Sequence, residues 1–372
     1  MLKKPVSSRL EEREESKKNE NIIKKKFKKK LVKSVEDNKK IVYKTQNKKE
    51  KIIKKSYIDK LDINSFGSIR EGFSKGLMEL GKLNKDVVVL SADLASSVKV
   101  ADFAKKYPKR FFEFGIAEQN MMSASAGMCL NNKIPFVTSY AVFNPGRNWD
   151  QVRVSVCYSN ANIKIFGSHA GLLTGADGAT HQALEDIAIT KVLANMCVIS
   201  PCDEEEMRKA VIESVKYNGP VYLRGVRENS LNITNKNTKF EIGKSNVLDK
   251  GDDLLIVSCG ICVRFALEAK RELLKLGIDS TVLNMHTIKP VDEHNLLKYA
   301  KKCKKVITIE DHQVIGGLGS SVCDVLSEKC PVRVEKIGMN DKFGESGEGY
   351  NLLEKYNIST KEIIKRAKKL VK

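Results

Sequence analysis

The chain has 372 residues, of which 41% are hydrophobic and 30% charged, and its formal net charge is +20. This length is sufficient for two domains with separate cores, and no apolar run approaches the roughly 18 residues of a membrane-spanning helix. Nine scattered cysteines and the lack of a signal-peptide pattern predict a cytoplasmic protein without a disulfide framework.

Most of the positive charge lies in an N-terminal arm. Residues 1–60 hold 22 Lys and Arg against 9 Asp and Glu, which is 13 of the 20 excess charges. Low hydrophobicity with high charge predicts a disordered or partly helical arm. The rest of the chain carries only +7, so nucleic-acid binding is not expected of the folded part. Contact of the arm with RNA or another acidic partner stays open.

Beyond the arm, helical and strand patterns alternate. Ile69, Phe73, Leu77 and Leu80 recur at helical spacing, and Gly81 is expected to end that helix. Strands are then expected at about 86–92, 111–115, 135–140, 162–167, 196–201 and 220–225. This alternation predicts a mainly parallel sheet with helices on both faces.

A polar stretch at 229–250 reads as a linker between two α/β domains. A second alternating run follows, with strands expected near 253–259, 279–285, 305–310 and 332–337. The expected fold is therefore α/β, with two tandem three-layer domains and mainly parallel sheets. Their ranges are 61–228 and 251–372, preceded by the basic arm 1–60.

The segment from Phe111 to Met121 reads as a short strand, a Gly turn and a helix that opens on Glu118. Open α/β sheets bind ligands beyond such strand ends. A carboxyl placed among Phe and Met side chains would be poorly solvated, and would stay ionised only beside a strong donor. The alternative is an ordinary first-turn glutamate, which the helix dipole favours.

Two further groups of residues follow expected strands. Tyr140 and Phe143 lie three residues apart, and their rings suit either a flat heterocycle or the core. A Gly-rich loop carries His169, Asp177 and His181. Their spacing is a weak metal signature, whereas polar groups on a loop that leaves a strand more often belong to a site.

The segment Gly115-Ile-Ala-Glu-Gln-Asn-Met121 resembles the pyrimidine-domain signature of thiamine-diphosphate enzymes of the transketolase family. The resemblance extends over almost all of the chain beyond the arm. It implies that Glu118 bonds N1′ of the cofactor's aminopyrimidine and activates the cofactor. It also implies that Tyr140 and Phe143 hold this ring and that Asp93 lies near the cofactor.

The Gly-rich loop resembles the transketolase substrate loop that ends in Asp-Gly-x-Thr-His-Gln. By that resemblance His169 contacts the substrate, Asp177 a sugar hydroxyl and His181 the reacting oxygen, so that both histidines are catalytic. Three residues match phosphate-binding positions of the family: Arg70, Ser97 and Arg227. They favour a sugar phosphate over pyruvate with lipoamide.

The motif with which relatives hold the diphosphate and its metal, Gly-Asp-Gly followed by Asn, is missing from this sequence. The resemblance therefore implies the C-terminal subunit of a split transketolase of the pentose phosphate pathway. We expect a separate N-terminal subunit carrying Mg²⁺ or Ca²⁺, an α2β2 assembly and no metal bound by this chain. The alternatives are a 1-deoxyxylulose-5-phosphate synthase-like enzyme, a 2-oxoacid dehydrogenase β-type subunit, or a non-catalytic assembly protein with a basic binding arm.

Four other residues, all in the second domain, are of types that often have catalytic, metal-binding or redox roles. His286 and His312 follow expected strands, and we interpret both as structural. Cys259 and Cys262 have thioredoxin-like spacing at a strand-to-helix turn, but no second cysteine pair completes a zinc site. We therefore expect no redox role for them.

Overall fold

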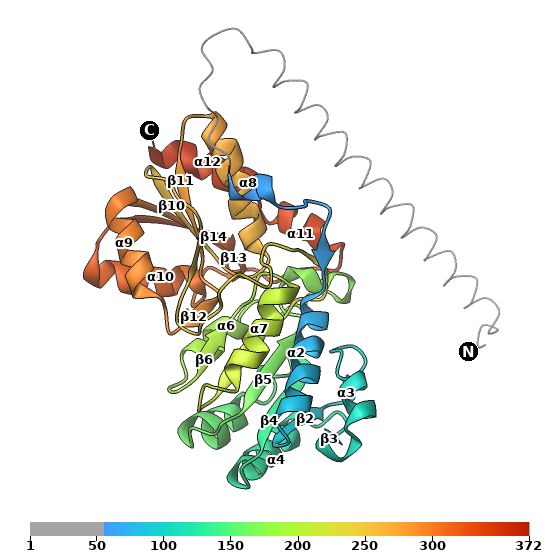
Figure 1. Cartoon of the computed structure of the whole chain (residues 1–372). Coiled ribbons are helices and arrows are strands. Elements are labelled where there is room, and N and C mark those ends of the chain that lie inside the picture. The colour runs from blue at the N-terminus through green and yellow to red at the C-terminus, as the bar shows by residue number, and fades with distance from the viewer. Residues whose placement is uncertain (1–55, 372) are drawn as a thin grey trace, which may run out of the picture. The chain divides into compact units, whose positions relative to one another are not determined.

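The computed structural model describes residues 56–371, so all but the last five residues of the predicted basic arm lie outside the described part. The described residues contain a seven-stranded sheet, a five-stranded sheet and a two-stranded ribbon. Each of the two larger sheets is flanked by helices (Figure 1). The prediction of two tandem α/β units with mainly parallel sheets is therefore confirmed.

The larger sheet has the strand order β12-β6-β7-β5-β4-β2-β3. Its strands are β2 (Val87–Ser91), β3 (Phe111–Glu113), β4 (Ile134–Tyr140), β5 (Lys164–Ser168), β6 (Cys197–Ile199), β7 (Val221–Arg224) and β12 (Thr287–Lys289). All neighbours are parallel except β12, which pairs antiparallel with β6. Since parallel strands end on the same side, the carboxyl ends of β2, β3, β4, β5 and β7 share one edge of the sheet.

Alternating side chains of each strand pack on the two helical layers. Val87 and Val89 belong to the core on one face, and Val88 and Leu90 to the core on the other. The helical segments of this unit are α2 (Ile69–Leu83), α3 (Ala101–Lys106), α4 (Glu118–Leu130), α5 (Trp149–Gln151), the π-helix η3 (Val152–Tyr158), α6 (Asp186–Lys191) and α7 (Glu204–Ser214). Short 3-10 helices lie at η1 (Tyr57–Lys60), η2 (Pro108–Arg110) and η4 (Leu172–Asp177).

The prediction that Gly81 ends the first long helix is wrong. Helix α2 continues to Leu83, and Gly81 lies inside it. A Cβ added at Gly81 would lie 2.5 Å from the ring of Tyr107. The glycine therefore allows the tyrosine ring to pack against the helix backbone.

The smaller sheet has the order β14-β13-β10-β11-β9. Its strands are β9 (Asn246–Asp249), β10 (Leu254–Ser258), β11 (Ser280–Asn284), β13 (Lys305–Gln313) and β14 (Arg333–Met339), and only β9 is antiparallel to its neighbour. Its helices are α8 (Cys262–Lys275), α9 (Glu293–Cys303), α10 (Leu318–Lys329), α11 (Gly349–Lys355) and α12 (Thr360–Val371). The ribbon consists of β1 (Phe66–Gly67) and β8 (Ser230–Leu231). The segment expected as a linker, 229–250, thus contains the two short strands β8 and β9.

Within residues 56–371, no helix is long and apolar enough to cross a membrane.

Candidate active site

The sequence-predicted site residues gather at the carboxyl edge of the seven-stranded sheet. Asp93 follows β2, Glu118 follows β3, Tyr140 ends β4, His169 follows β5 and Arg227 follows β7. These strands are neighbours in the sheet and parallel. Their ends therefore lie side by side, where open α/β sheets bind ligands.

Glu118 is the first residue of α4, and it is only 2% exposed. Its Oε2 accepts a hydrogen bond of 2.9 Å from the guanidinium of Arg147, whose side chain is 44% exposed. The side-chain amide of Asn148 donates to the backbone carbonyl of Glu118 at 3.2 Å. The positive end of the helix also favours a carboxylate at this position. The buried acid is thus paired with a cation that solvent reaches.

Four flat groups form a continuous stack beside Glu118. The ring centroids of His169 and Tyr140 are 3.8 Å apart, and those of Tyr140 and Phe143 are 6.0 Å apart with planes inclined by 12°. The guanidinium carbon of Arg147 lies 4.3 Å from the centroid of Phe143. Because Arg147 bonds Glu118 and stacks on Phe143 at once, a flat ring in its place would meet both residues.

The two loop histidines differ in environment. The imidazole of His169 is buried, whereas His181 is partly exposed and presents its ring edge-on to Phe143, with the centroids 5.5 Å apart. Burial, together with the positive charges of Arg70 and Arg227, lowers the pKa of His169 to about 3. His169 is therefore a neutral hydrogen-bonding group at pH 7, and it does not act there as a cationic acid.

Two arginines converge on the same edge. Arg70 donates hydrogen bonds to the backbone carbonyls of Ser97 at 3.0 Å and of Arg227 at 2.8 Å. Arg227 in turn donates to the carboxylate of Asp177 at 3.1 Å and to the carbonyl of Thr174 at 3.0 Å. Burial and the neighbouring Arg227 lower the pKa of Arg70. A phosphate would relieve this proximity of like charges, and its paired oxygens match an arginine fork.

Asp93 is exposed and has a left-handed φ of +57°. Its backbone N–H donates to the carboxylate of Glu113 at 2.7 Å, and the N–H groups of Phe114 and Gly115 donate to the same oxygen at 3.1 and 3.2 Å. Glu113 therefore fixes the turn that leads to the helix of Glu118. Sequence analysis missed Glu113, although an acid between a strand and a Gly turn was the available signal.

Comparison with known proteins agrees with this geometry. Residues 67–231 match the pyrimidine-binding domain of transketolase, and residues 243–363 match the transketolase C-terminal domain. A protein of Methanocaldococcus jannaschii described as a putative transketolase C-terminal section is 41% identical over 304 residues, which is 81% of this chain and 95% of that protein. The chain belongs to the transketolase family.

Two further relatives are also separate subunits or split-gene products. An apulose-4-phosphate transketolase subunit of Phocaeicola vulgatus is 38% identical over 310 residues, covering 83% of this chain and 99% of that protein. A solved structure described as a split-gene transketolase in an inactive β4 tetramer is 43% identical. It superposes with a TM-score of 0.77 and covers 82% of this chain and 98% of its own. The resemblance to the C-terminal subunit of a split transketolase is thus confirmed.

Two residues that were not predicted from the sequence hold the Gly-rich loop that contains His169, Asp177 and His181. Gln182 donates its side-chain amide to the carbonyls of Gly175 at 3.1 Å and of Glu345 at 2.9 Å. Asp311, near the end of β13 in the second unit, accepts a hydrogen bond of 3.0 Å from the backbone N–H of Leu172. A pair of acids, Glu310 and Asp311, at the end of an apolar strand was the only sequence signal. The second unit thus contacts the loop that carries the site residues Asp177 and His181.

His286, His312, Cys259 and Cys262 are buried, whereas the fifth histidine, His294, is exposed. Burial lowers the pKa of His286 to about 3 and that of His312 to about 4. Burial also raises the pKa of the Cys259 and Cys262 thiols. Since the thiolate is the reactive form, both cysteines stay protonated and unreactive at neutral pH.

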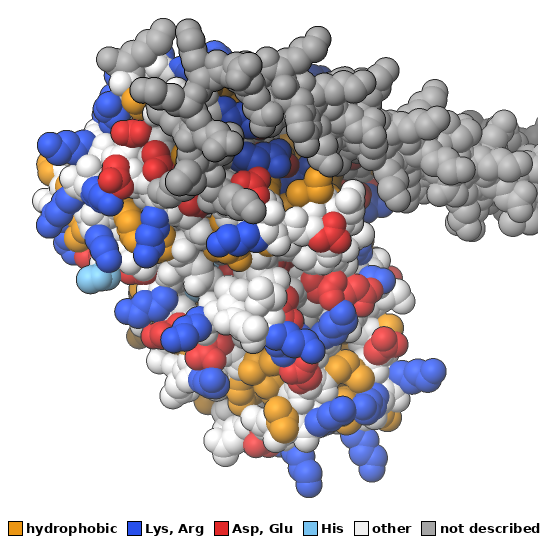
Figure 2. Space-filling model, turned by 45° about the horizontal axis from the view of Figure 1, so that its top comes forward, with side chains coloured by type: hydrophobic (Ala, Val, Ile, Leu, Met, Phe, Trp, Pro, Cys, Tyr) orange, Lys and Arg blue, Asp and Glu red, His pale blue; other side chains and the backbone are white. Residues whose placement is uncertain are grey.

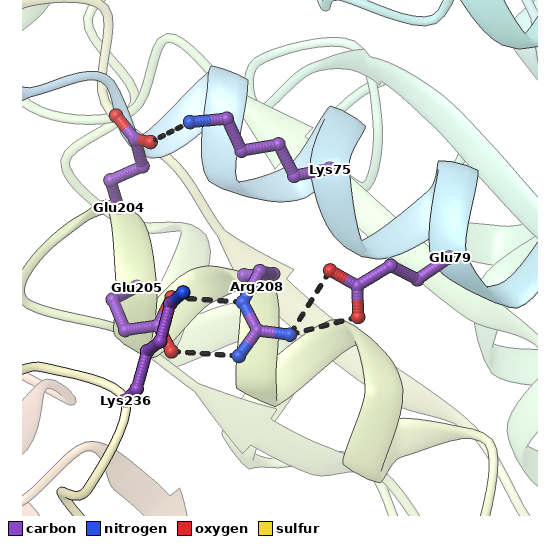
Figure 3. Close-up of a pocket in the computed structure, with 6 residues that line it drawn as sticks. All are labelled: Lys75, Glu79, Glu204, Glu205, Arg208 and Lys236. Atoms are coloured by element: carbon purple, nitrogen blue, oxygen red, sulfur yellow. Dashed lines mark hydrogen bonds and ion pairs between the residues drawn. The ribbon is translucent and has the colours of Figure 1, made fainter.

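A separate charged groove lies between α2 and α7 (Figure 3). It is lined by Lys75, Glu79, Glu204, Glu205, Arg208 and Lys236. Arg208 donates to both carboxylate oxygens of Glu205 at 2.7 and 2.8 Å and to Glu79 at 2.9 Å. The ion pairs Lys75–Glu204 and Arg208–Glu79 each join α2 to α7, so these charges tie the two helices together. In the described part of the chain, no group of three or more His, Cys, Asp or Glu residues is placed to hold a metal ion.

Proposed function

We propose that this chain is the C-terminal subunit of a thiamine-diphosphate-dependent transketolase, which transfers a two-carbon ketol unit between sugar phosphates in the cytoplasm. The pentose phosphate pathway is the setting we propose. One observation carries the proposal: the buried Glu118 carboxylate lies beside the Phe143 ring, on the edge where Arg70 and Arg227 converge. This edge thus combines an acid for a ring nitrogen, an aromatic face for a flat ring and two cations for a phosphate.

The residues present fit the pyrimidine end of thiamine diphosphate. The bound cofactor would supply the nucleophilic carbon that takes up the ketol unit. Glu118 would hold the proton shared with the ring nitrogen N1′, and burial makes this exchange independent of bulk water. Phe143 would stack on the ring, and Tyr140, whose ring is nearly parallel to that of Phe143 at a centroid distance of 6.0 Å, would help to hold it. We place Asp93 at the border of this pocket.

The substrate end follows from the charges described above. Arg70 and Arg227 would bind the phosphate of the sugar. Asp177 would bind a hydroxyl once an anion competes for Arg227. Neutral His169 would donate or accept a hydrogen bond, and partly exposed His181 would exchange a proton at the reacting oxygen.

We further propose that a separate N-terminal subunit supplies the diphosphate site and Mg²⁺ or Ca²⁺ in an α2β2 complex. The missing Gly-Asp-Gly motif supports this proposal. Exposed apolar side chains around α4 also support it, because Ile116, Leu130 and Tyr158 are 75%, 86% and 87% exposed. Large exposed apolar side chains of this kind mark contact surfaces. We also propose that residues 61–228 bind the pyrimidine and residues 251–372 form the C-terminal domain, with 229–250 joining them.

The surface charge supports a small anionic substrate over a nucleic acid. On the face shown in Figure 2, basic and acidic side chains of the described residues are intermixed. Nucleic-acid binding generally requires a clustered basic patch. The two arginines of the site instead provide a local anion site.

The test is Glu118→Ala in the complex formed with the N-terminal subunit, with Glu328→Ala, an exposed glutamate on α10, as the matched control. We expect Glu118→Ala to lower ketol transfer by about 100-fold or more and to raise the thiamine-diphosphate requirement, and the control to behave as wild type. Full transfer by Glu118→Ala at an unchanged cofactor requirement refutes the assignment.

The alternatives give different results in the same assay. Use of pyruvate as donor would indicate a 1-deoxyxylulose-5-phosphate synthase-like enzyme, and transfer to lipoamide a 2-oxoacid dehydrogenase subunit. A wild-type complex that binds no thiamine diphosphate would indicate the non-catalytic assembly protein.

A further inference from the structure

Arg147 makes the contacts that a flat nitrogen heterocycle would make beside Glu118 and Phe143. Its guanidinium donates an N–H to the Glu118 carboxylate at 2.9 Å and lies 4.3 Å from the centroid of Phe143. A guanidinium is planar, donates hydrogen bonds in its plane and stacks on aromatic rings. An aminopyrimidine held by an acid and an aromatic ring has the same three properties.

The backbone around Arg147 is held by buried hydrogen bonds, whereas its side chain is partly exposed to solvent. Asn144 and Asn148 are fully buried on either side of it. The amide of Asn144 donates to the carbonyl of Val137 at 3.0 Å, and the amide of Asn148 donates to Asn144 at 3.0 Å. By contrast, 44% of the Arg147 side chain is exposed. The guanidinium can therefore leave Glu118 by rotation of its own side chain, without any rearrangement of the backbone.

We propose that the Arg147 side chain occupies the place of the cofactor's aminopyrimidine before the cofactor binds. The cofactor displaces Arg147 from Glu118 and Phe143 when it binds. The inference rests on the proposed function of Glu118 and Phe143. While Arg147 is in place, the buried carboxylate of Glu118 keeps a partner, so the pocket holds no uncompensated charge before assembly. The cofactor must then compete with Arg147 for Glu118. The apparent affinity for the cofactor equals the intrinsic affinity multiplied by the fraction of chains in which Arg147 has left Glu118.

The experiment measures thiamine-diphosphate binding in the presence of Mg²⁺ by calorimetry, on the complex with the N-terminal subunit. The variants are Arg147→Met, which keeps the length of the side chain, and Arg147→Lys, which keeps the charge but loses the planar group. The control is Arg153→Met, because Arg153 is an exposed arginine of η3 with no ion pair among the described residues. We expect Arg147→Met to bind the cofactor about five- to tenfold tighter than wild type. Arg147→Lys should fall between the two, and Arg153→Met should equal wild type.

A second readout uses no cofactor. Arg147→Met should lower the unfolding temperature of the free chain, because Glu118 loses its partner, and saturating thiamine diphosphate should close this gap in the complex. Equal or weaker cofactor binding by Arg147→Met overturns the inference, since Arg147 would then belong to the loaded pocket. If Arg147→Met does not fold, Arg147→Lys decides in the same way. A wild-type complex that fails to bind thiamine diphosphate instead overturns the proposed function itself.

Discussion

Replacing Asp311 by alanine tests whether the second α/β unit positions the substrate loop. The Asp311 side chain is buried, and its carboxylate accepts a hydrogen bond of 3.0 Å from the backbone N–H of Leu172. A hydrogen bond to a charged acceptor contributes about 1.5–3 kcal/mol, and its loss would leave the buried N–H of Leu172 without a partner. Against this, burial raises the pKa of Asp311, so its charge is itself unfavourable there. We therefore expect Asp311→Ala to lower the free energy of unfolding by about 2–4 kcal/mol.

The assay joins stability with kinetics. Thermal unfolding of the chain should show the loss, and the complex should show a KM for the ketose phosphate about tenfold higher, because the loop carrying His181 is no longer held. Affinity for thiamine diphosphate should change by less than about twofold, since Glu118 and Phe143 follow other strands. Asp324→Ala is the matched control, because Asp324 is 74% exposed and lies 3.6 Å from Lys191, a surface pair that contributes about 0–1 kcal/mol. The prediction is refuted if Asp311→Ala is as stable as Asp324→Ala. It is also refuted if the affinity for thiamine diphosphate falls by the same factor by which KM rises.

Two further predictions concern stability. Arg208→Ala should lower the free energy of unfolding by about 1 kcal/mol, because it removes the ion pairs with Glu79 and Glu205. Denaturant midpoints should show a smaller difference from wild type in about 1 M salt, which screens these pairs. An unchanged difference would contradict an electrostatic role. His286 has a folded pKa of about 3 because it is buried, so only the unfolded chain binds its proton between about pH 6.5 and pH 3, and stability is lost as the pH falls through this window. His286→Phe removes this contribution, so unfolding midpoints should show the variant gaining on wild type by up to about 1.4 kcal/mol per pH unit between about pH 6 and 4. Burial raises the pKa values of Glu206 and Glu310 to about 7, so their effect on stability has the opposite pH dependence. That effect is the same in variant and wild type and cancels in the difference between them. A stability difference that does not change with pH would contradict the prediction.

Local sequence pattern was sufficient for the central strands but not for the edges. Each buried parallel strand reads as an apolar run, and the predicted runs lie within three residues of the observed strands. The edge strands β9 and β12 escaped prediction because neither contains an apolar run: β9 reads Asn-Val-Leu-Asp and β12 reads Thr-Ile-Lys. Strand β12 also pairs with β6 of the other unit. Pairing between units depends on tertiary structure, which no local period encodes.

The candidate site likewise contains residues that short motifs predict and residues that only the fold brings near. Glu118, Tyr140 and Phe143 could be predicted as site candidates because they lie inside short motifs that follow strands. Their partners were not, since Arg147 lies 29 residues from Glu118 in sequence. Asp311 is 139 residues from Leu172. A motif predicts which side chains face a ligand, whereas their charge state and support depend on groups that only the fold brings near.

The buried contacts between the two units indicate why a catalytic chain retains the second one. Arg224 and Asp186 form an ion pair of 2.8 Å with side chains only 3% and 0% exposed, and Arg224 also donates to the carbonyl of Asp311 at 2.8 Å. A buried ion pair contributes little net stability compared with apolar residues of similar volume, but it accepts only one arrangement of its partners. Because Arg224 ends β7 of the first unit, this pair sets the position of Asp311, and Asp311 sets that of Leu172 at the start of the substrate loop. The geometry of the substrate loop is thus fixed jointly by both units.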